Sequence, residues 1–255
     1  MPQASFKIAL LTLCLILSLG LFAQPDPESA ANITDTKGRK QGLWIKKDST
    51  GQVLYEGNFK DNQPTGEFRY YFPSGKMRTT LTYSPSGSTV SNISYYESGV
   101  RMAEGNFVDQ KKDGLWKYFN DLGDLASEEN YSKGVASGVW KVYYQGMKVM
   151  EEFTYRNGKK EGSWKQYFPS GNLKAEAMYI DGQRQGPAKF YFPDGAIMTR
   201  GNYRNDLKNG IWENYKQNGQ KESVREFDNG NMISETYYDK AREQELFQES
   251  PEIKK

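Results

Sequence analysis

Acidic side chains recur at a fixed spacing in this chain and are the first candidates for chemistry. They are Glu56, Glu104, Glu128, Glu152 and Glu176, separated by 24 residues or by a multiple of 24. Two carboxylates that lie roughly 5 to 9.5 Å apart supply the acid and base, or the acid and nucleophile, of glycoside hydrolases. A catalytic pair would break a repeat, whereas these acids follow it, and Lys117, Lys141 and Lys165 recur at the same spacing. We therefore interpret the acids as partners in cross-strand ion pairs, and the sequence predicts no catalytic residue.

Other kinds of active site are limited by what the 255-residue chain lacks. It contains no His and a single Cys, Cys14, so no imidazole is present to act as a general base or a metal ligand. Its 34 Lys and Arg residues nearly balance its 32 Asp and Glu residues, which leaves a net charge of +2 and no cation excess for nucleic acid. The sequence therefore predicts no cofactor, no metal site and no nucleic-acid partner.

The N-terminal segment has the composition of an export signal. Lys7 precedes an apolar run, and Ala23 is a small residue at a suitable cleavage position. Residues 24–34 follow as a polar, proline-containing linker, which disfavours an uncleaved anchor. We expect residues 1–23 to be removed by cleavage near Ala23, giving an exported protein that is periplasmic or secreted. Because the segment contributes one cation and Cys14, the mature chain would carry a charge of +1, which gives no support for membrane association beyond the signal.

A period of 24 residues organises the rest of the chain. We call its reference positions nodes and number other residues by their offset from the node. The nodes are Gly42, Gly66, Gly114, Gly138, Gly162, Gly186 and Gly210, with Val90 in the third unit. All five Trp lie at offset 2, at Trp44, Trp116, Trp140, Trp164 and Trp212. Every unit has a ring at offset 17, namely Phe59, Tyr83, Phe107, Tyr131, Tyr155, Tyr179, Tyr203 and Phe227. The predicted structural core consists of the Trp column, of Gly114, Gly138, Gly162, Gly186 and Gly210, and of Tyr131, Tyr155, Tyr179 and Tyr203.

The period divides the chain into eight units and two flanks. The predicted array covers residues 35–238, with units at 35–58, 59–82, 83–106, 107–130, 131–154, 155–178, 179–202 and 203–226 and a closing strand at 227–238. Residues 239–255 are charged and lack Gly, so we expect a short helix or a loose solvated tail. The fifth unit slips, because Gly146 stands one place before offset 9, where every other unit has Gly.

Each unit has the pattern of a β-hairpin. Strand-like residues 164–168 are followed by the turn sequence Pro-Ser-Gly-Asn at 169–172. With Ser170 and Gly171 as the central turn residues, the offsets of cross-strand partners sum to 17, so the node Gly lies beneath the ring at offset 17. The predicted fold is all-β: an elongated, single-layer antiparallel meander of about eight 24-residue hairpins.

Side-chain alternation along the strands sorts the residues into two faces. One face is predicted to collect the Trp column and the apolar residues at offset 11, which are Val53, Met77, Leu125, Val149, Leu173 and Ile197. The other carries the Lys and Glu ladders and a Tyr row at offset 5: Tyr71, Tyr95, Tyr143, Tyr167, Tyr191 and Tyr215. The Tyr row is the candidate ligand-facing surface, because periodic rings beside polar groups can stack on glycans or peptides. Plain cross-strand stabilisation is the alternative, and the interpretation that we favour.

Parts of the first two units resemble the MORN repeat. Residues 55–62, Tyr-Glu-Gly-Asn-Phe-Lys-Asp-Asn, and residues 66–75, Gly-Glu-Phe-Arg-Tyr-Tyr-Phe-Pro-Ser-Gly, carry its succession of Tyr-x-Gly, aromatic, turn, Gly and Tyr. Most other units have Gly-x-Trp and are similar to the MORN-variant repeats of many bacterial proteins, some of which are antitoxins of toxin–antitoxin systems. The resemblance implies a hairpin rod without catalysis of its own, of the kind used as a scaffold, a dimerisation rod, or a membrane- or protein-binding module.

Two functional classes remain open at the level of the sequence. The leading hypothesis is a non-catalytic exported scaffold that binds an unidentified protein partner, because one uninterrupted array leaves no room for a second domain. The alternative is a carbohydrate or cell-wall binder that uses the Tyr row. The resemblance adds an antitoxin-like, toxin-neutralising role, which the export signal places in conflict with a cytoplasmic partner.

Overall fold

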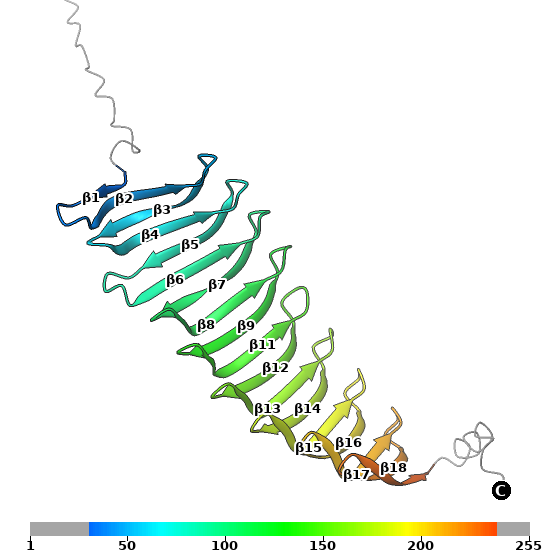
Figure 1. Cartoon of the computed structure of the whole chain (residues 1–255). Helices are drawn as coiled ribbons and strands as arrows, with labels where there is room; N and C mark the ends of the chain where they lie inside the picture. The colour runs from blue at the N-terminus through cyan, green and yellow to red at the C-terminus, as the bar shows by residue number, and fades with distance from the viewer. Residues whose placement is uncertain (1–30, 239–255) are drawn as a thin grey trace, which may run out of the picture.

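The computed structural model describes residues 31–238, which form one open sheet of 19 strands (Figure 1). Consecutive hairpins lie side by side along one axis, and neighbouring strands are antiparallel. No helix occurs in residues 31–238. The predicted all-β, single-layer antiparallel meander is confirmed. The predicted signal at 1–23, most of the linker and the tail at 239–255 lie outside the described residues.

The strands are short and mostly of similar length, as repeated hairpins require. Their bounds are Ile33–Thr34 (β1), Lys40–Lys47 (β2), Val53–Lys60 (β3), Gln63–Tyr71 (β4), Met77–Tyr83 (β5), Thr89–Tyr95 (β6), Arg101–Val108 (β7), Lys111–Phe119 (β8), Leu125–Ser132 (β9), Val135–Ala136 (β10), Gly138–Tyr143 (β11), Val149–Arg156 (β12), Lys159–Tyr167 (β13), Leu173–Ile180 (β14), Gln183–Tyr191 (β15), Ile197–Arg204 (β16), Leu207–Tyr215 (β17), Lys221–Asp228 (β18) and Asn231–Tyr237 (β19). Strands β10 and β11 both pair with β9, so together they act as one interrupted strand.

The turn inside each hairpin is one residue longer than predicted. In the sixth unit, Gly171 N–H donates to the Phe168 carbonyl and Phe168 N–H donates to the Asn172 carbonyl, both at 2.8 Å. Pro169 and Ser170 are therefore the central turn residues, and Gly171 follows with φ of 97°, where glycine meets no steric penalty. The prediction that Ser170 and Gly171 form the centre is wrong, because the loop is a three-residue turn that ends in a left-handed glycine.

A β-bulge beside this turn reverses the predicted face of offset 11. Pairing in the sixth hairpin keeps the predicted offset sum of 17 as far as Gln166 and Ala175, and then slips so that Tyr167 pairs with Leu173. Directly paired residues share a face of the sheet. One extra residue in a strand moves all the following side chains to the opposite face. Offset 11 therefore lies on the side of the Tyr row.

Charged residues at offset 11 show the same reversal. Lys221 forms an ion pair with Glu213 of the charged ladder at 2.7 Å, and Arg101 forms one with Glu104 at 2.6 Å. The prediction that the aliphatic residues at this offset share a face with the Trp column is wrong for the same reason. They are Val53, Met77, Leu125, Val149, Leu173 and Ile197.

Consecutive hairpins are joined by two-residue turns that need a left-handed backbone. At Asn157 and Gly158 both φ angles are positive, 51° and 79°, as in a type I′ turn. Six further connections carry the same pair of positive φ angles. Their first residue is Asp, Asn or Lys, and Asp and Asn tolerate this conformation best among residues with a side chain.

The node glycines are required by the backbone and not by ring packing. All seven have φ between 65° and 86°. A Cβ added at Gly162 or Gly210 would meet nothing within 4 Å, although Gly162 does pair with Tyr179 as predicted. Since an L-residue is strained at such a φ, glycine is the residue that fits the bulge after each connecting turn. The predicted reason, a ring lying on the glycine, is wrong.

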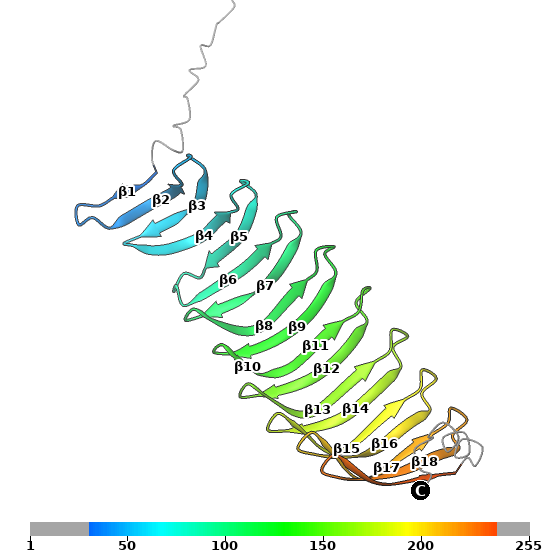
Figure 2. The same cartoon turned by 45° about the vertical axis from the view of Figure 1, so that its right-hand side comes forward.

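The third unit lacks the bulge found at the other nodes, which explains why Val90 and not glycine stands at its node. Here Tyr83 pairs directly with Val90, and the β5–β6 register has no shift, so this unit lacks the bulge. The two residues that form the bulge elsewhere join the connecting loop, which spans residues 84–88 and stands out from the edge of the sheet (Figure 2). A β-branched residue suits the regular strand that results, and the 24-residue period is preserved.

The strands of this single layer are curved (Figure 2). Burial comes from rings packed between neighbouring hairpins. Trp116 and Trp212 are only 3% and 1% exposed, and the Trp212 ring lies 5.0 Å from that of Tyr203. The indole N–H of Trp116, Trp140 and Trp212 donates to the carbonyl of an Asn at offset 16 of the preceding unit, at 2.8 to 3.1 Å. Each Trp thus ties two units together through both packing and a hydrogen bond.

Small residues at offset 15 make room for these rings. A Cβ added at Gly57, Gly105 or Gly201 would overlap the ring at offset 2 of the next unit, which is Phe68, Trp116 or Trp212. Where the seventh unit has Ala188 in the Trp slot, its partner is Ala177. A glycine therefore faces a large ring at three junctions, whereas Phe153 faces Trp164 at another.

Gly201→Ala tests this match. Because the added methyl group would overlap the Trp212 indole, we expect the free energy of unfolding to fall by about 2 kcal/mol through overpacking, measured by urea denaturation. Ala177→Gly, at the same offset but opposite Ala188, is the control and should cost less than about 1 kcal/mol. Adding Trp212→Ala should give a double variant that loses less than the sum of the single losses. Equal losses for the two single variants would contradict the match.

Candidate interaction surface

The Tyr row lies along one face of the sheet, which we call the tyrosine face. Each of its members is the last residue of the first strand of a hairpin and is partly exposed. They are Tyr71 on β4, Tyr95 on β6, Tyr143 on β11, Tyr167 on β13, Tyr191 on β15 and Tyr215 on β17. The tyrosine face also carries offsets 1 and 3 of the first strand and offsets 11, 14 and 16 of the second.

Three hydroxyls of the Tyr row donate a hydrogen bond to a ladder carboxylate of the preceding hairpin. The bonds are Tyr71 to Glu56 at 2.6 Å, Tyr143 to Glu128 at 2.8 Å and Tyr191 to Glu176 at 2.6 Å. Partial burial, followed by the neighbouring carboxylate, raises the pKa of each of these tyrosines to about 12. A phenol of this pKa stays protonated near neutral pH, so these hydroxyls are donors in a structural bond and not general bases. Their rings remain available on the surface.

Charges alternate across the tyrosine face in a continuous ladder. From Lys117 to Glu176 every cross-strand step pairs a Lys with a Glu, within hairpins as predicted and also between them. Ion-pair distances along the ladder are 4.0 Å for Lys117 and Glu128, 3.7 Å for Lys141 and Glu152, and 3.4 Å for Lys189 and Glu176. Such exposed pairs add little stability individually. Their regular alternation instead favours one register over its neighbours.

The alternation is broken between β15 and β16. Lys189 there stands directly opposite Arg200, a like-charge pair, although Arg200 Nε bonds to Glu213 at 2.5 Å. A depression of about 380 Å³ is lined by both cations and by the apolar residues Pro187 and Ile211. This part of the face therefore combines positive charge with apolar walls.

Glu213 is held in its ionised form by three donors. Lys221 Nζ lies 2.7 Å from one carboxylate oxygen, while Arg200 Nε at 2.5 Å and the Tyr215 hydroxyl at 2.9 Å share the other. These bonds lower the pKa of Glu213 to about 2, and the bond from Lys221 has the largest effect. The carboxylate therefore stays charged down to strongly acidic pH.

Exposed aliphatic side chains form a second band on the tyrosine face, beyond the charged ladder. They are Leu115, Val139, Met178 and Ile211, with exposed fractions of 42%, 41%, 43% and 49%. Together with the Tyr row and the offset 11 residues, they give the face two apolar bands on either side of the charges. The aliphatic band is interrupted by polar residues, since Leu115 pairs with Asn130 and Ile211 with Glu226.

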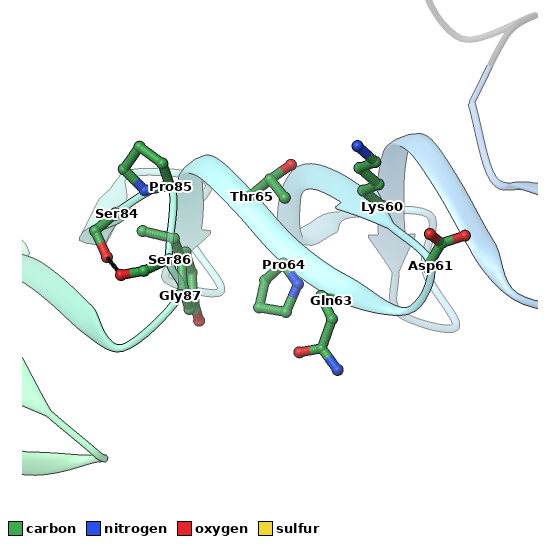
Figure 3. A pocket seen from close by; sticks show the side chains of 10 residues that line it. Lys60, Asp61, Gln63, Pro64, Thr65, Ser84, Pro85, Ser86 and Gly87 are labelled. Carbon is green, nitrogen blue, oxygen red and sulfur yellow. Dashed lines mark hydrogen bonds between the residues drawn. The ribbon is translucent and has the colours of Figure 1, made fainter.

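A separate pocket lies at the irregular third unit, between the β3–β4 turn and the loop at 84–88 (Figure 3). It has a volume of about 410 Å³, and Lys60, Gln63 and Pro64 are among its lining residues. The hydroxyls of Ser84 and Ser86 bond to each other at 3.1 Å on the opposite wall. The lining offers hydrogen bonds to a polar ligand.

The opposite face, which we call the ring face, carries the predicted core. Trp116, Trp212 and Tyr203 are buried there. The other predicted rings named as core, Trp44, Trp140, Trp164, Tyr131, Tyr155 and Tyr179, are partly exposed. The register therefore separates the Trp column from the Tyr row, as the sequence predicted.

Cations cover the rings of the ring face in five units. These contacts were not predicted from the sequence. Each cation lies two residues before its node, within 4.8 Å of a ring centroid, and the set is Lys40, Lys112, Lys160, Arg184 and Lys208. Desolvation lowers the pKa of Lys208, as expected for an ammonium packed on rings. The recurrence of these cations every 24 residues is visible in the sequence and is the signal that could have identified them.

Within residues 31–238, no group of His, Cys, Asp and Glu side chains is arranged to hold a metal ion. That part of the chain also contains no helix of the length and apolarity needed to span a bilayer.

Comparison with protein families gives a match to the MORN repeat variant. Its model matches residues 40–61, 64–84, 112–133, 160–181 and 184–205. These segments belong to units one, two, four, six and seven. The third, fifth and eighth units are not among the matches. A search of curated proteins gave no match.

Some solved structures are similar to parts of this chain at low sequence identity. A crystal structure of TarM is 16% identical with a TM-score of 0.29, covering 38% of this chain and 19% of that one. An S. aureus TarM mutant in complex with fondaparinux, alpha-GlcNAc-glycerol and UDP is 13% identical with a TM-score of 0.30, covering 49% and 22%. A GtfA/B complex bound to UDP and GlcNAc is 11% identical with a TM-score of 0.16, covering 54% and 23%. This chain thus spans about a fifth of the length of these proteins, and no functional conclusion follows at such TM-scores.

The lowered pKa of Glu213 predicts a specific dependence of stability on pH. Since the folded pKa of about 2 lies below the ordinary value of 4.5, ionised Glu213 stabilises the fold above pH 5, and this stabilisation is lost as the pH falls towards 2. Glu213→Gln should therefore cost on the order of 1–2 kcal/mol at pH 7 and much less near pH 2 in urea denaturation. Glu97→Gln, in an exposed turn, should leave the profile unchanged. A Glu213→Gln cost that is constant from pH 7 to pH 2 would contradict the role of these bonds.

Proposed function

We propose that this chain, whose units match the MORN repeat variant, is an exported, non-catalytic scaffold that binds a protein partner through its tyrosine face. The proposed site of action is the cell envelope or the space outside the cell. Export is supported by the composition of residues 1–23, and a binding role is supported by the family match, because MORN repeats commonly serve as interaction modules.

The observation that carries the proposal is the banding of the tyrosine face. Partly exposed rings of the Tyr row run beside one edge of the charged ladder, and exposed aliphatic residues such as Leu115 and Ile211 run beside the other. Protein interfaces combine aromatic and aliphatic anchors with polar groups that fix the register of the partner. The face continues across successive hairpins, so it offers a long surface and not a closed pocket.

The interactions of the ladder carboxylates support a role without catalysis. Ladder carboxylates such as Glu128 and Glu152 lie beside Lys in cross-strand pairs, and Glu128 also accepts a hydrogen bond from Tyr143. Carboxylates engaged in this way repeat from unit to unit, whereas a catalytic pair needs two distinct environments.

Carbohydrate or cell-wall binding is the second candidate function, and the Tyr row favours it. Its rings lie at a spacing of two strands, about 9.6 Å, which suits stacking on every second sugar of an extended polymer. The antitoxin-like role is a special case of protein binding, and the identity of a captured partner would reveal it.

The tyrosine face can be tested by capture from envelope extracts of the source organism. We expect the parent chain to retain a reproducible protein partner and the triple variant Tyr143→Ala, Tyr167→Ala, Tyr191→Ala to lose it at least about ten-fold, since buried aromatic anchors dominate interface energies. The matched control replaces the same residues with Phe, which keeps the rings and removes the hydroxyls, and should retain the partner. Retention of purified peptidoglycan or polysaccharide by the parent, without any protein partner, would instead support the second candidate.

A further inference from the structure

The fifth unit is the one Trp-containing unit of the array without a cation over its rings. The ring-covering position holds Ala136 there, where the other four Trp units have Lys. Ala136 occupies the same register as those cations, because it pairs with Tyr131 as Lys160 pairs with Tyr155 and Lys208 with Tyr203. The backbone is thus in place for a cation that the sequence does not supply.

Trp140 and Tyr155, over which no cation of residues 31–238 lies, form a compact ring group with Tyr131, which Lys112 covers from one side. The Trp140 ring lies 4.7 Å from that of Tyr155 and 5.3 Å from that of Tyr131, measured between centroids. Trp140 is partly exposed, as are Trp44 and Trp164, whereas Trp116 and Trp212, which Lys112 and Lys208 cover, are 3% and 1% exposed. The aromatic surface that binds a cation within the chain elsewhere is therefore accessible to solvent in this unit.

Two carboxylates accompany this ring group and break the repeat. Glu129 at offset 15 and Glu151 at offset 13 are the only acids at these two ring-face positions in the array. Glu129 accepts hydrogen bonds from the Tyr131 hydroxyl at 2.6 Å and from Ser127 at 3.3 Å, and Glu151 accepts one from the Trp164 indole at 2.5 Å. Neither carboxylate forms an ion pair with any residue of the described range 31–238.

Both acids act electrostatically on Tyr155, one of the two rings without a covering cation. The pKa of Tyr155 is raised by burial first, and then by Glu129 and Glu151. The neighbouring cations Lys112 and Lys160 are packed on flanking rings, at 5.0 Å from the Tyr131 centroid and 4.3 Å from the Phe153 centroid. The ring group therefore has the aromatic surface and the negative charge of a cation site.

We propose that Trp140, Tyr155, Glu129 and Glu151 form a site on the ring face that receives an Arg or Lys side chain of a protein partner. The guest replaces the lysine that the other Trp units carry, with its cationic head over the rings and its charge facing the two carboxylates. Charge complementarity selects this occupant, because an anionic group would be repelled and a neutral group would leave both carboxylates unpaired. The identification of the donor as a protein rests on the proposed function.

The test uses the full chain and a fluorescein-labelled hexa-arginine peptide, with binding measured by fluorescence anisotropy at low salt. Ala136→Lys supplies the missing cation from within the chain and should weaken peptide binding roughly five-fold or more, because the rings are then covered. Glu129→Gln combined with Glu151→Gln should weaken it by a similar factor. Unfolding by urea checks that both variants remain folded.

Glu97→Gln combined with Asp121→Asn is the matched control. Both residues lie in exposed hairpin turns outside the ring group and the charged ladder, so the change in charge is identical and the site is left intact. This control should bind the peptide within about two-fold of the parent. Parent-like binding by Ala136→Lys, or an equal loss in the control, would overturn the site.

The site and the proposed function can fail separately. If Ala136→Lys weakens peptide binding but the parent captures no protein from envelope extracts, the cation site stands and the proposed function fails. If the parent captures a partner that Ala136→Lys retains equally well, the scaffold function stands and the assignment of this site to the partner is overturned.

Discussion

The structure depends on packing rings within a sheet that has no second layer. A sheet normally buries one face against another element, and residues 31–238 contain none. Burial therefore has to come from neighbouring hairpins, where a large ring such as Trp212 lies over a residue without a side chain, Gly201. Each ring contacts the next unit, so stability is shared along the array in nearest-neighbour steps. The absence of another layer also leaves two long faces accessible.

Bulges decide what those two faces carry. The slip beside each hairpin turn moves offset 11 to the tyrosine face, where Leu173 accompanies Tyr167 and Lys221 reaches Glu213. The bulge at each node fixes a left-handed backbone, which explains the recurring glycine without any contact to a ring. As a result the tyrosine face is amphipathic and banded, while the ring face combines aromatic packing with covering cations.

Departures from the repeat mark where this array differs from a uniform rod. The third unit moves two residues from a bulge to a loop and so forms a polar pocket. The fifth unit lacks a covering cation, and Glu129 of the fourth unit and Glu151 of the fifth add two acids to the ring face beside it. The seventh places Lys189 opposite Arg200. A regular repeat supplies the architecture, and each of these substitutions changes the chemistry that a partner would meet.

The sequence by itself determined the hairpin repeat, the number of units, the ladder and the separation of the Trp column from the Tyr row. These follow from a strict period and from alternation along regular strands. Only the tertiary structure decided the face of offset 11, the role of the node glycines and the bonds of Tyr143 to Glu128 or Trp140 to Asn130. A bulge shifts side chains by one residue without changing the period, so periodicity cannot reveal it. Covering of rings by cations likewise depends on strands that the chain brings together only on folding.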